Sequence, residues 1–239
     1  MSETRAQIGI VDCDRIDPAL AALHGQYSDM FIRALGAQQA GLRFAVYQGM
    51  SEPLPEPTQH RAWLITGSRH SAFDPLPWID NLKAWIRQAS RQPVQLAGIC
   101  FGHQVIAEAL GGRVTRSPAG WGMGLYRTQR IGDAPWLDRS PTLALLASHQ
   151  DQVQQLPSGA RLLYRCDFCP YYSFALENRI FTVQGHPEFT IDYNLALAQK
   201  RRQRLGEDVY QRALRSFEQQ PDSERFLAGL LRFLLREPH

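Results

Sequence analysis

A cysteine flanked by glycines is the clearest candidate for a reactive group. Cys100 stands in the segment Gly98-Ile99-Cys100-Phe101-Gly102, between an apolar run and a helical pattern. A nucleophile on a tight strand-to-helix turn needs small neighbours, because the chain must fold back sharply around it. The start of a helix favours negative charge, and therefore a thiolate and a developing oxyanion. We interpret Cys100 as a nucleophile; a small buried cysteine after a strand is the alternative.

A histidine and a glutamate provide the partners that such a nucleophile needs. They occur in Gly185-His186-Pro187-Glu188, directly after an apolar run. The thiol needs an imidazole as its base, and the imidazole needs a group that orients it. Residues two apart lie on the same side of an extended chain, and Pro187 fixes the backbone between them. The pattern predicts that Glu188 orients His186; a polar strand end at the surface is the alternative.

The elements that would position these residues alternate between strand and helix patterns in the first half of the chain. Strands are predicted over residues 6–12, 42–47, 63–66 and 94–99, and helices over about 27–35, 77–86 and 102–110. Such alternation favours right-handed βαβ units and a mostly parallel sheet covered on both faces. The fold class is therefore predicted to be α/β.

The second half of the sequence is richer in strand patterns. Strands are predicted over residues 124–129, 143–147, 161–164, 172–176 and 180–183, and helical patterns return from residue 193 to the end. No repeat, low-complexity tract or linker interrupts the chain. We expect one domain over residues 1–239, with a core over about 6–190 and C-terminal helices over about 191–239.

The composition is that of a globular protein, with 44% hydrophobic residues. No stretch approaches the roughly 18 consecutive apolar residues of a membrane span. The first residues lack the basic-then-apolar shape of a signal peptide. Four scattered cysteines indicate a reduced compartment rather than a disulfide scaffold. We expect a cytoplasmic protein with no membrane partner.

Charge and cysteine spacing exclude some other classes of site. The net charge is only +3, and the basic run at residues 200–204 is typical of a solvated helix face. No nucleic-acid partner is therefore predicted. Cys166 and Cys169 form a C-x-x-C pair, but a structural zinc site needs two further ligands that the sequence does not supply. We predict no metal and no cofactor, and assign the pair no role.

Two distant motifs resemble one known family. Residues 98–104, which end in Gly102-His103-Gln104, and residues 185–188 together resemble the signature of the class I glutamine amidotransferases. The resemblance extends from about residue 7 to 190. It includes Thr66-Gly67-Ser68, similar to the family's oxyanion strand. It also includes residues 148–157, similar to the segment that closes over glutamine in the subgroup like the amidotransferase domain of GMP synthase.

The resemblance implies a fold and a catalytic mechanism. The fold would be flavodoxin-like and three-layered, with a mostly parallel central sheet and additional strands. Cys100 would attack the amide carbon and form a γ-glutamyl thioester. His186 would deprotonate the thiol and then protonate the leaving ammonia or amine, and Glu188 would orient His186. Water would resolve the thioester.

The resemblance also implies roles for residues around the triad. The backbone N–H groups of Gly67 and Phe101 would form the oxyanion hole. Gln104 would help to place the substrate. The amino-acid head group would be held, mainly through the backbone, by Ser148, Gln150 and Asp151. A glycine is usual in the family where Gln150 stands, so this loop departs from the pattern.

Three functional hypotheses follow. The first is a stand-alone hydrolase of glutamine or of a γ-glutamyl peptide or amine, because the 239 residues leave no room for a synthetase region. The second is a glutaminase subunit that passes ammonia to a separate synthase. The third is a non-catalytic member that binds a metabolite or a protein. The leaving group is not specified, and we expect loops to set it. These loops cover residues 50–60, 68–76, 117–124 and 166–172.

Overall fold

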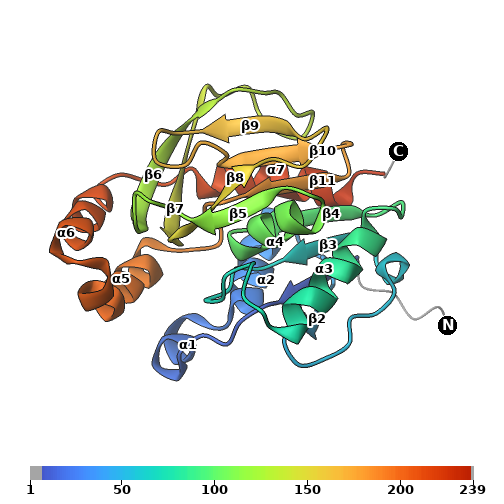
Figure 1. The fold of residues 1–239 in the computed structure, drawn as a ribbon, viewed down its shortest axis with the longest axis horizontal. Coiled ribbons are helices and arrows are strands. Elements are labelled where there is room, and N and C mark those ends of the chain that lie inside the picture. The colour runs from blue at the N-terminus through green and yellow to red at the C-terminus, as the bar shows by residue number, and fades with distance from the viewer. Residues whose placement is uncertain (1–6, 238–239) are drawn as a thin grey trace.

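A nine-stranded sheet runs through the computed structural model, which describes residues 7–237 (Figure 1). Its parallel part consists of β2 (Phe44–Gln48), β1 (Ile8–Asp12), β3 (Ala62–Ile65), β4 (Gln95–Ile99) and β11 (Ile180–Val183), in that order. Four antiparallel strands continue the sheet: β10 (Ser173–Leu176), β9 (Arg161–Arg165), β6 (Gly122–Arg130) and β7 (Thr142–His149). A small second sheet pairs β5 (Arg113–Arg116) with β8 (Asp151–Gln155).

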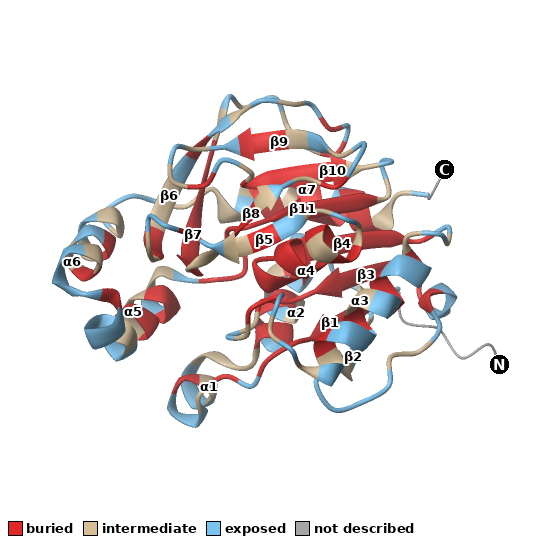
Figure 2. Ribbon diagram, viewed as in Figure 1, coloured by how far each residue is buried: buried red, intermediate tan, exposed pale blue. Residues whose placement is uncertain are grey.

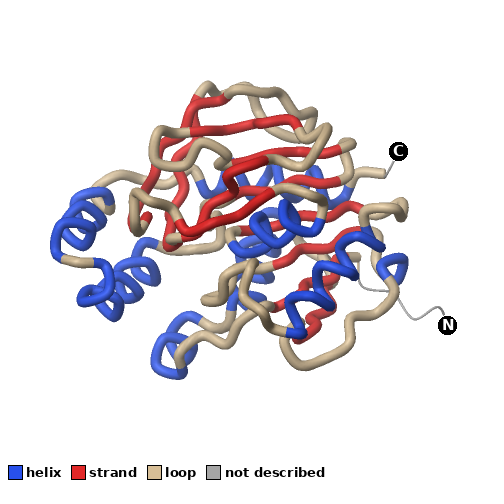
Figure 3. Tube along the Cα trace, in the orientation of Figure 1, coloured by secondary structure: helices blue, strands red, loops and turns tan. Residues whose placement is uncertain are grey.

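Helices cover both faces of the sheet, as the coils on either side of the strands in Figure 3 show. The helices are α1 (Pro18–His24), α2 (Tyr27–Gln38), α3 (Pro77–Ala89), α4 (Phe101–Ala109), α5 (Ile191–Leu205), α6 (Glu207–Ser216) and α7 (Ser223–Leu235), with a short 3₁₀ turn at Pro57–Gln59. The helices α2 and α7 share one apolar core with the sheet, and α3 and α4 share the other. The sheet is therefore the middle of three layers.

Burial follows the alternation of these layers. The parallel strands β1, β3, β4 and β11 are buried along their whole length, and Figure 2 shows them as red arrows between helices with pale outer sides. Strands covered on both faces are expected to be mostly apolar, and these are, apart from Asp12, Gln95 and Thr182. Burying one large apolar side chain contributes about 1.5–3 kcal/mol to stability, so this double core fixes the strand ends firmly.

The parallel order contains a point where the connections change direction. The strand β1 lies between β2 and β3, with Ile8 opposite both Phe44 and Ala62. The chain passes from β1 to β2 on one side and returns to β3 on the other. In open α/β sheets, ligands bind outside the carboxyl ends of the strands at such a switch point.

The predicted alternation of strands and helices in the first half is confirmed. The sequence did not indicate α1, β5 or β8. The expected C-terminal helical region consists of three helices, α5, α6 and α7, and Gly206, with φ +78°, separates α5 from α6. Residues 1–6 and 238–239, including the first residue of the expected strand 6–12, lie outside the described residues. In the described part, no helix is long and apolar enough to cross a membrane.

Candidate active site

The turn at Cys100 has the strained geometry of a nucleophile elbow. Cys100 connects β4 to α4 with φ 53° and ψ −101°, a conformation that L-residues rarely adopt. A Cβ on Gly98 would lie 2.5 Å from the Gly102 carbonyl oxygen, and a Cβ on Gly102 would lie 2.3 Å from the Ile65 carbonyl oxygen. Both glycines are therefore required for the close approach of β3, β4 and α4. Strain of this kind costs about 1–3 kcal/mol and occurs mainly at functional sites.

His186 and Glu188 form a buried pair next to this cysteine. The Nδ1 atom of His186 lies 2.7 Å from Oε1 of Glu188, and the side chains are 2% and 0% exposed. Cys100 borders the same cavity as His186, and its sulfur acts on the imidazole by raising the pKa of His186. Since Glu188 occupies Nδ1, the other ring nitrogen is left for the thiol. The structure thus brings the three residues of the predicted triad together.

The charge of the imidazole depends on its two partners. Burial alone would lower the pKa of His186, but the neighbouring Glu188 carboxylate and Cys100 sulfur outweigh burial and raise this pKa to about 10. An imidazolium is therefore favoured at neutral pH. The backbone turns at Pro187 and Glu188, so the extended conformation expected there is wrong, although the pair still forms.

Aromatic rings hold the His186 imidazole in place. The Phe189 ring stacks on it, with centroids 3.8 Å apart and planes 6° apart. Tyr27 stacks more loosely, 6.3 Å from His186 and 5.9 Å from Phe189. The His186 amide donates to the Leu146 carbonyl, so the backbone is fixed as well. A base held this way loses little entropy when it transfers a proton.

A glutamine that the sequence did not single out also contacts the cysteine. The Nε2 atom of Gln184 donates to the Cys100 sulfur over 3.5 Å, and its Oε1 atom accepts from Nε2 of Gln104 over 3.0 Å. Gln104 Nε2 also donates to the Asp151 carbonyl over 2.8 Å. Gln104, expected to place the substrate, is therefore bonded to protein groups through this nitrogen. The only sequence signal for Gln184 is its position two residues before His186.

Two backbone amides predicted to form an oxyanion hole lie beside Cys100. Gly67 follows β3, and a Cβ built on it would lie 3.0 Å from Cε1 of His186 and 3.8 Å from Cβ of Cys100. Phe101 opens α4 directly after the cysteine. Within the described residues, neither the Gly67 amide nor the Phe101 amide donates a hydrogen bond. Both amides are therefore available as donors. They lie near each other because they follow β3 and β4, which are neighbours in the sheet.

A cavity of about 240 Å³ opens above Cys100. Its wall includes the three residues expected to hold a head group, Ser148, Gln150 and Asp151. The Ser148 hydroxyl accepts from Arg201, and the Gln150 carbonyl accepts from the Ser117 amide. In the described residues, only three non-glycine residues have positive φ, and Gln150 is not among them. The loop therefore needs no glycine at this position.

Asp151 presents a fixed carboxylate to the same cavity. Its Oδ2 atom accepts from the Ser71 hydroxyl, and its Oδ1 atom lies 3.7 Å from Nε of Arg116. The side chain is 13% exposed. Arg116 lines the cavity beside it, so a cation and an anion are available for the two charges of an amino-acid head group.

The C-x-x-C pair lies in a tight turn outside this cavity. The amide of each cysteine donates to the carbonyl of the other, at 3.1 Å in both directions. Burial raises the pKa of the Cys166 and Cys169 thiols, which makes thiolates unfavourable. No group of three or more possible metal-ligating side chains occurs in residues 7–237. Packing is the role these contacts support.

Comparison with known proteins assigns the chain and its fold to one family. Residues 35–195 match the family model described as "Glutamine amidotransferase class-I". The chain belongs to the class-I glutamine amidotransferase family. It is a hydrolytic enzyme of that family, and the predicted flavodoxin-like α/β fold is confirmed.

Individual relatives span most of the chain. γ-Glutamyl peptidase 2 of Arabidopsis thaliana is 28% identical over 212 residues, which cover 85% of each protein. The glutamine-hydrolysing GMP synthase of Aeropyrum pernix is 31% identical over 172 residues, which cover 69% of this chain and 31% of the synthase. A solved structure, the glutamine amidotransferase of Methylobacillus flagellatus, superposes with a TM-score of 0.71 at 24% identity and covers 98% of this chain and 97% of its own.

Proposed function

We propose that this enzyme hydrolyses γ-glutamyl amides through a covalent intermediate on Cys100. The observation that carries the proposal is the chain of contacts from Cys100 to His186 to Glu188, on an elbow beside two available amides. A reactive thiol, a base and an orienting carboxylate in this order are the components of nucleophilic amide hydrolysis.

The first half of the reaction transfers the γ-glutamyl group to sulfur. His186 holds the thiol proton as an imidazolium, and the Cys100 thiolate attacks the amide carbon. The amide oxygen becomes an oxyanion, which the N–H groups of Gly67 and Phe101 stabilise. When the intermediate collapses, the carbon–nitrogen bond breaks and His186 gives its proton to the leaving nitrogen. A γ-glutamyl thioester remains on Cys100.

The second half returns the enzyme to its starting state. His186 takes a proton from a water molecule, which attacks the thioester carbon. The carbon–sulfur bond breaks, glutamate leaves, and the proton returns to the thiol–imidazole pair. During both halves, Glu188 holds the imidazole in one orientation and stabilises its positive charge.

The head group of the substrate would be held by charge on the cavity wall. The Asp151 carboxylate is suited to an α-ammonium group, and the Arg116 guanidinium to an α-carboxylate. Backbone groups of Ser148 and Gln150 would complete the contacts. Hydrogen bonds to charged groups contribute about 1.5–3 kcal/mol each, enough to select a γ-glutamyl group over a plain amide.

A panel of amides tests the proposal. Glutamine, γ-glutamyl peptides and γ-glutamyl amines are incubated with the wild type, with Cys100→Ala, and with Cys169→Ala as a control at a buried cysteine outside the cavity. We expect turnover of a γ-glutamyl peptide without a partner protein, its loss in Cys100→Ala, and its retention in Cys169→Ala. The name of the Arabidopsis relative, which aligns over 85% of both proteins, supports a peptide substrate.

The second candidate function is a glutaminase subunit that supplies ammonia to a separate synthase. The match to a glutamine-hydrolysing GMP synthase supports it. Weak glutamine hydrolysis that rises sharply when a synthase is added would favour this function over the hydrolase. Absence of turnover of every amide, with binding unchanged in Cys100→Ala, would instead favour a non-catalytic member.

A further inference from the structure

A second hollow joins the cavity above Cys100. It measures about 560 Å³, within the range of roughly 300–1,000 Å³ typical of small-molecule sites. The two hollows adjoin, because both are lined by Tyr27, Arg69, Arg201 and Arg204, and together they are called the groove. Released ammonia is about the size of a water molecule, whose share of liquid volume is about 30 Å³. The second hollow has room for a much larger leaving group.

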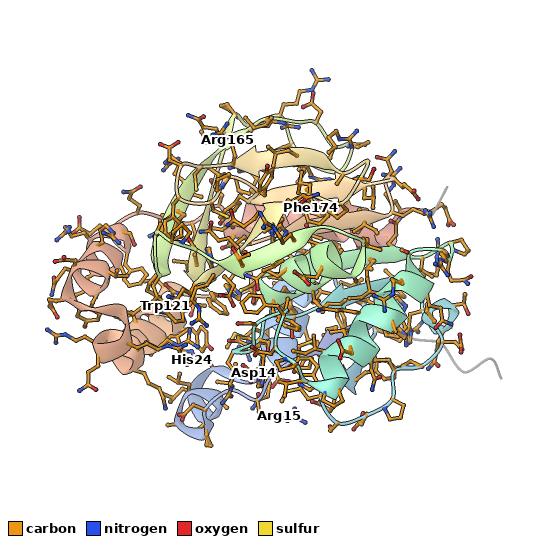
Figure 4. All side chains as sticks on the ribbon, in the orientation of Figure 1. Asp14, Arg15, His24, Trp121, Arg165 and Phe174 are labelled. Carbon is orange, nitrogen blue, oxygen red and sulfur yellow. The ribbon has the colours of Figure 1, made fainter. Side chains whose placement is uncertain are left out.

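The hollow lies at the switch point of the sheet. One wall comes from residues 14–18, which follow the carboxyl end of β1, and Arg69 follows β3. The strands β1 and β3 are the neighbours between which the connections change direction. This is the position at which open α/β sheets bind ligands. Figure 4 labels Asp14 and Arg15 on this wall and Trp121 near α5 opposite.

The opposite wall is one face of α5. Tyr193, Leu197, Lys200, Arg201 and Arg204 line the hollow, at the three- and four-residue spacing of a single helix face. Three of the four basic residues expected on a solvated face therefore line the groove.

The fourth basic residue of the run is oriented differently. Arg202 forms two hydrogen bonds with the Glu207 carboxylate and does not line either hollow. It is exposed and belongs to the same helix as Arg204, so it can serve as a matched control.

The cations of the groove outnumber its anions. Arg69 pairs with Asp14, and Lys200 pairs with Asp17. Within residues 7–237, no carboxylate forms an ion pair with Arg15, Arg201 or Arg204. The guanidinium groups of Arg201 and Arg204 lie 5.7 and 4.7 Å from the Trp121 ring centroid, which orients them without neutralising them.

The position of His186 indicates that the leaving group lies on the side of the second hollow. His186 must protonate the leaving nitrogen, and Tyr27 lies next to the His186 ring and borders both hollows. Gln104 and Asp151, which face the expected head group, line the first cavity but not the second hollow. A substrate with its head group at Asp151 and its scissile bond at Cys100 therefore extends past Tyr27 into the second hollow.

We propose that the hollow between the β1–α1 loop and α5 binds the leaving group of the substrate, and that Arg15 and Arg204 recognise a carboxylate on it. The leaving group would be a short peptide with a free C-terminal carboxylate. Buried Ile16, Leu20 and Leu197 line the same hollow and would contact an apolar side chain of this peptide. The inference rests on the proposed γ-glutamyl hydrolase activity.

Two substrates that differ in one charge test the inference. We compare γ-glutamyl-leucyl-glycine with γ-glutamyl-leucyl-glycinamide. The two differ only in the C-terminal group, a carboxylate or an amide, which is far from the scissile nitrogen. The wild type should favour the acid in kcat/KM by roughly tenfold, as expected for a charge-assisted contact. Arg204→Gln and Arg15→Gln should each reduce this preference toward one. Arg202→Gln, outside the groove, should keep it.

The outcomes separate the inference from the activity. Equal turnover of the acid and the amide by the wild type overturns the carboxylate site and leaves the hydrolase intact. An unchanged preference in both Arg204→Gln and Arg15→Gln also overturns it. If neither substrate is hydrolysed, the proposed activity fails. Calorimetric titration with leucyl-glycine and leucyl-glycinamide then tests the carboxylate site. Binding of leucyl-glycine alone, with loss of this binding in Arg204→Gln, supports the site. Equal binding of both compounds, or no binding of either, contradicts it.

Discussion

At the scale of single residues, the site depends on groups that fix the charge and orientation of two reacting side chains. Glu188 and Cys100 together raise the pKa of the buried His186 imidazole to about 10. Gln184 donates to the sulfur and is itself held by Gln104. Gln184 and Glu188 both lie in the segment that follows β11, and Gln104 lies in α4, so one short segment supports both reacting groups.

Replacing Glu188 tests the orienting carboxylate. Glu188→Gln removes the charge that raises the pKa of His186, so this pKa should fall. The imidazolium is then lost at lower pH than in the wild type, and the alkaline limb of the activity profile should move to lower pH. We expect kcat/KM to fall by about 100-fold or more, but less than in Cys100→Ala. An unchanged pH profile would contradict this role.

Replacing Gln184 tests the donor to sulfur. Gln184→Met keeps the size of the side chain but removes the N–H group that would stabilise a thiolate. The rate at which iodoacetamide alkylates Cys100 at neutral pH should fall severalfold, as expected for one lost hydrogen bond. Gln152→Met is the control, because Gln152 is equally buried but donates to the Phe168 carbonyl. Equal effects of the two substitutions would show a packing role only.

At the scale of elements, the site is a junction of strand ends with one helix start. β3 ends before Gly67, β4 before Cys100 and β11 before His186, and these strands are consecutive in the sheet. The glycines of the elbow let β3, β4 and α4 approach closely enough to align these ends. A change of packing here should act on the reacting groups directly.

A pair of glycine substitutions tests this dependence. Gly102→Ala places a methyl group 2.3 Å from the Ile65 carbonyl oxygen, and overpacking of this kind costs about 1–3 kcal/mol or more. We expect a lower denaturation midpoint and loss of activity. Gly36 is an exposed position of α2, and a Cβ built there meets no atom within 4 Å, so Gly36→Ala should stabilise the protein by roughly 0.5–1 kcal/mol and keep its activity. Similar effects of the two changes would refute the close-approach argument.

At the scale of the whole molecule, buried histidines link stability to pH. Burial lowers the pKa of His103 to about 3 and that of His149 to about 4, against an ordinary value of 6.5. The unfolded chain binds these protons as the pH falls below 6.5, and the folded chain does not. Unfolding is therefore favoured progressively from pH 6.5 down to these lower values.

Removing one of these histidines tests the linkage. In His103→Gln, the free energy of unfolding should depend less steeply on pH between about 6 and 4, because each unit of pKa shift corresponds to about 1.4 kcal/mol. Denaturant titrations at several pH values give this slope. His24→Gln, at a partly exposed histidine, provides the comparison. A slope equal to that of the wild type would rule out His103 as a source of acid instability.

The sequence predicted what depends on local geometry. The elbow glycines, the strand–helix alternation and the His186–Glu188 pair each have a signature within a few residues. Gln184, β5 and β8 were missed because their partners lie far away in the chain, as in the pairing of Arg113 with Gln155. The second hollow was missed for the same reason, since the β1–α1 loop and α5 meet only in the folded chain. The loops expected to set the leaving group did not include either segment.

The central claim is that the γ-glutamyl group is transferred to Cys100, and mass spectrometry of the enzyme tests it most directly. A γ-glutamyl peptide is mixed with excess enzyme, quenched in acid, digested and mapped over the four cysteines. The account predicts one γ-glutamyl group on Cys100 during turnover, absent from Cys100→Ala and more persistent in Glu188→Gln. A γ-glutamyl group on Cys13, Cys166 or Cys169, or full turnover by Cys100→Ala, would contradict it.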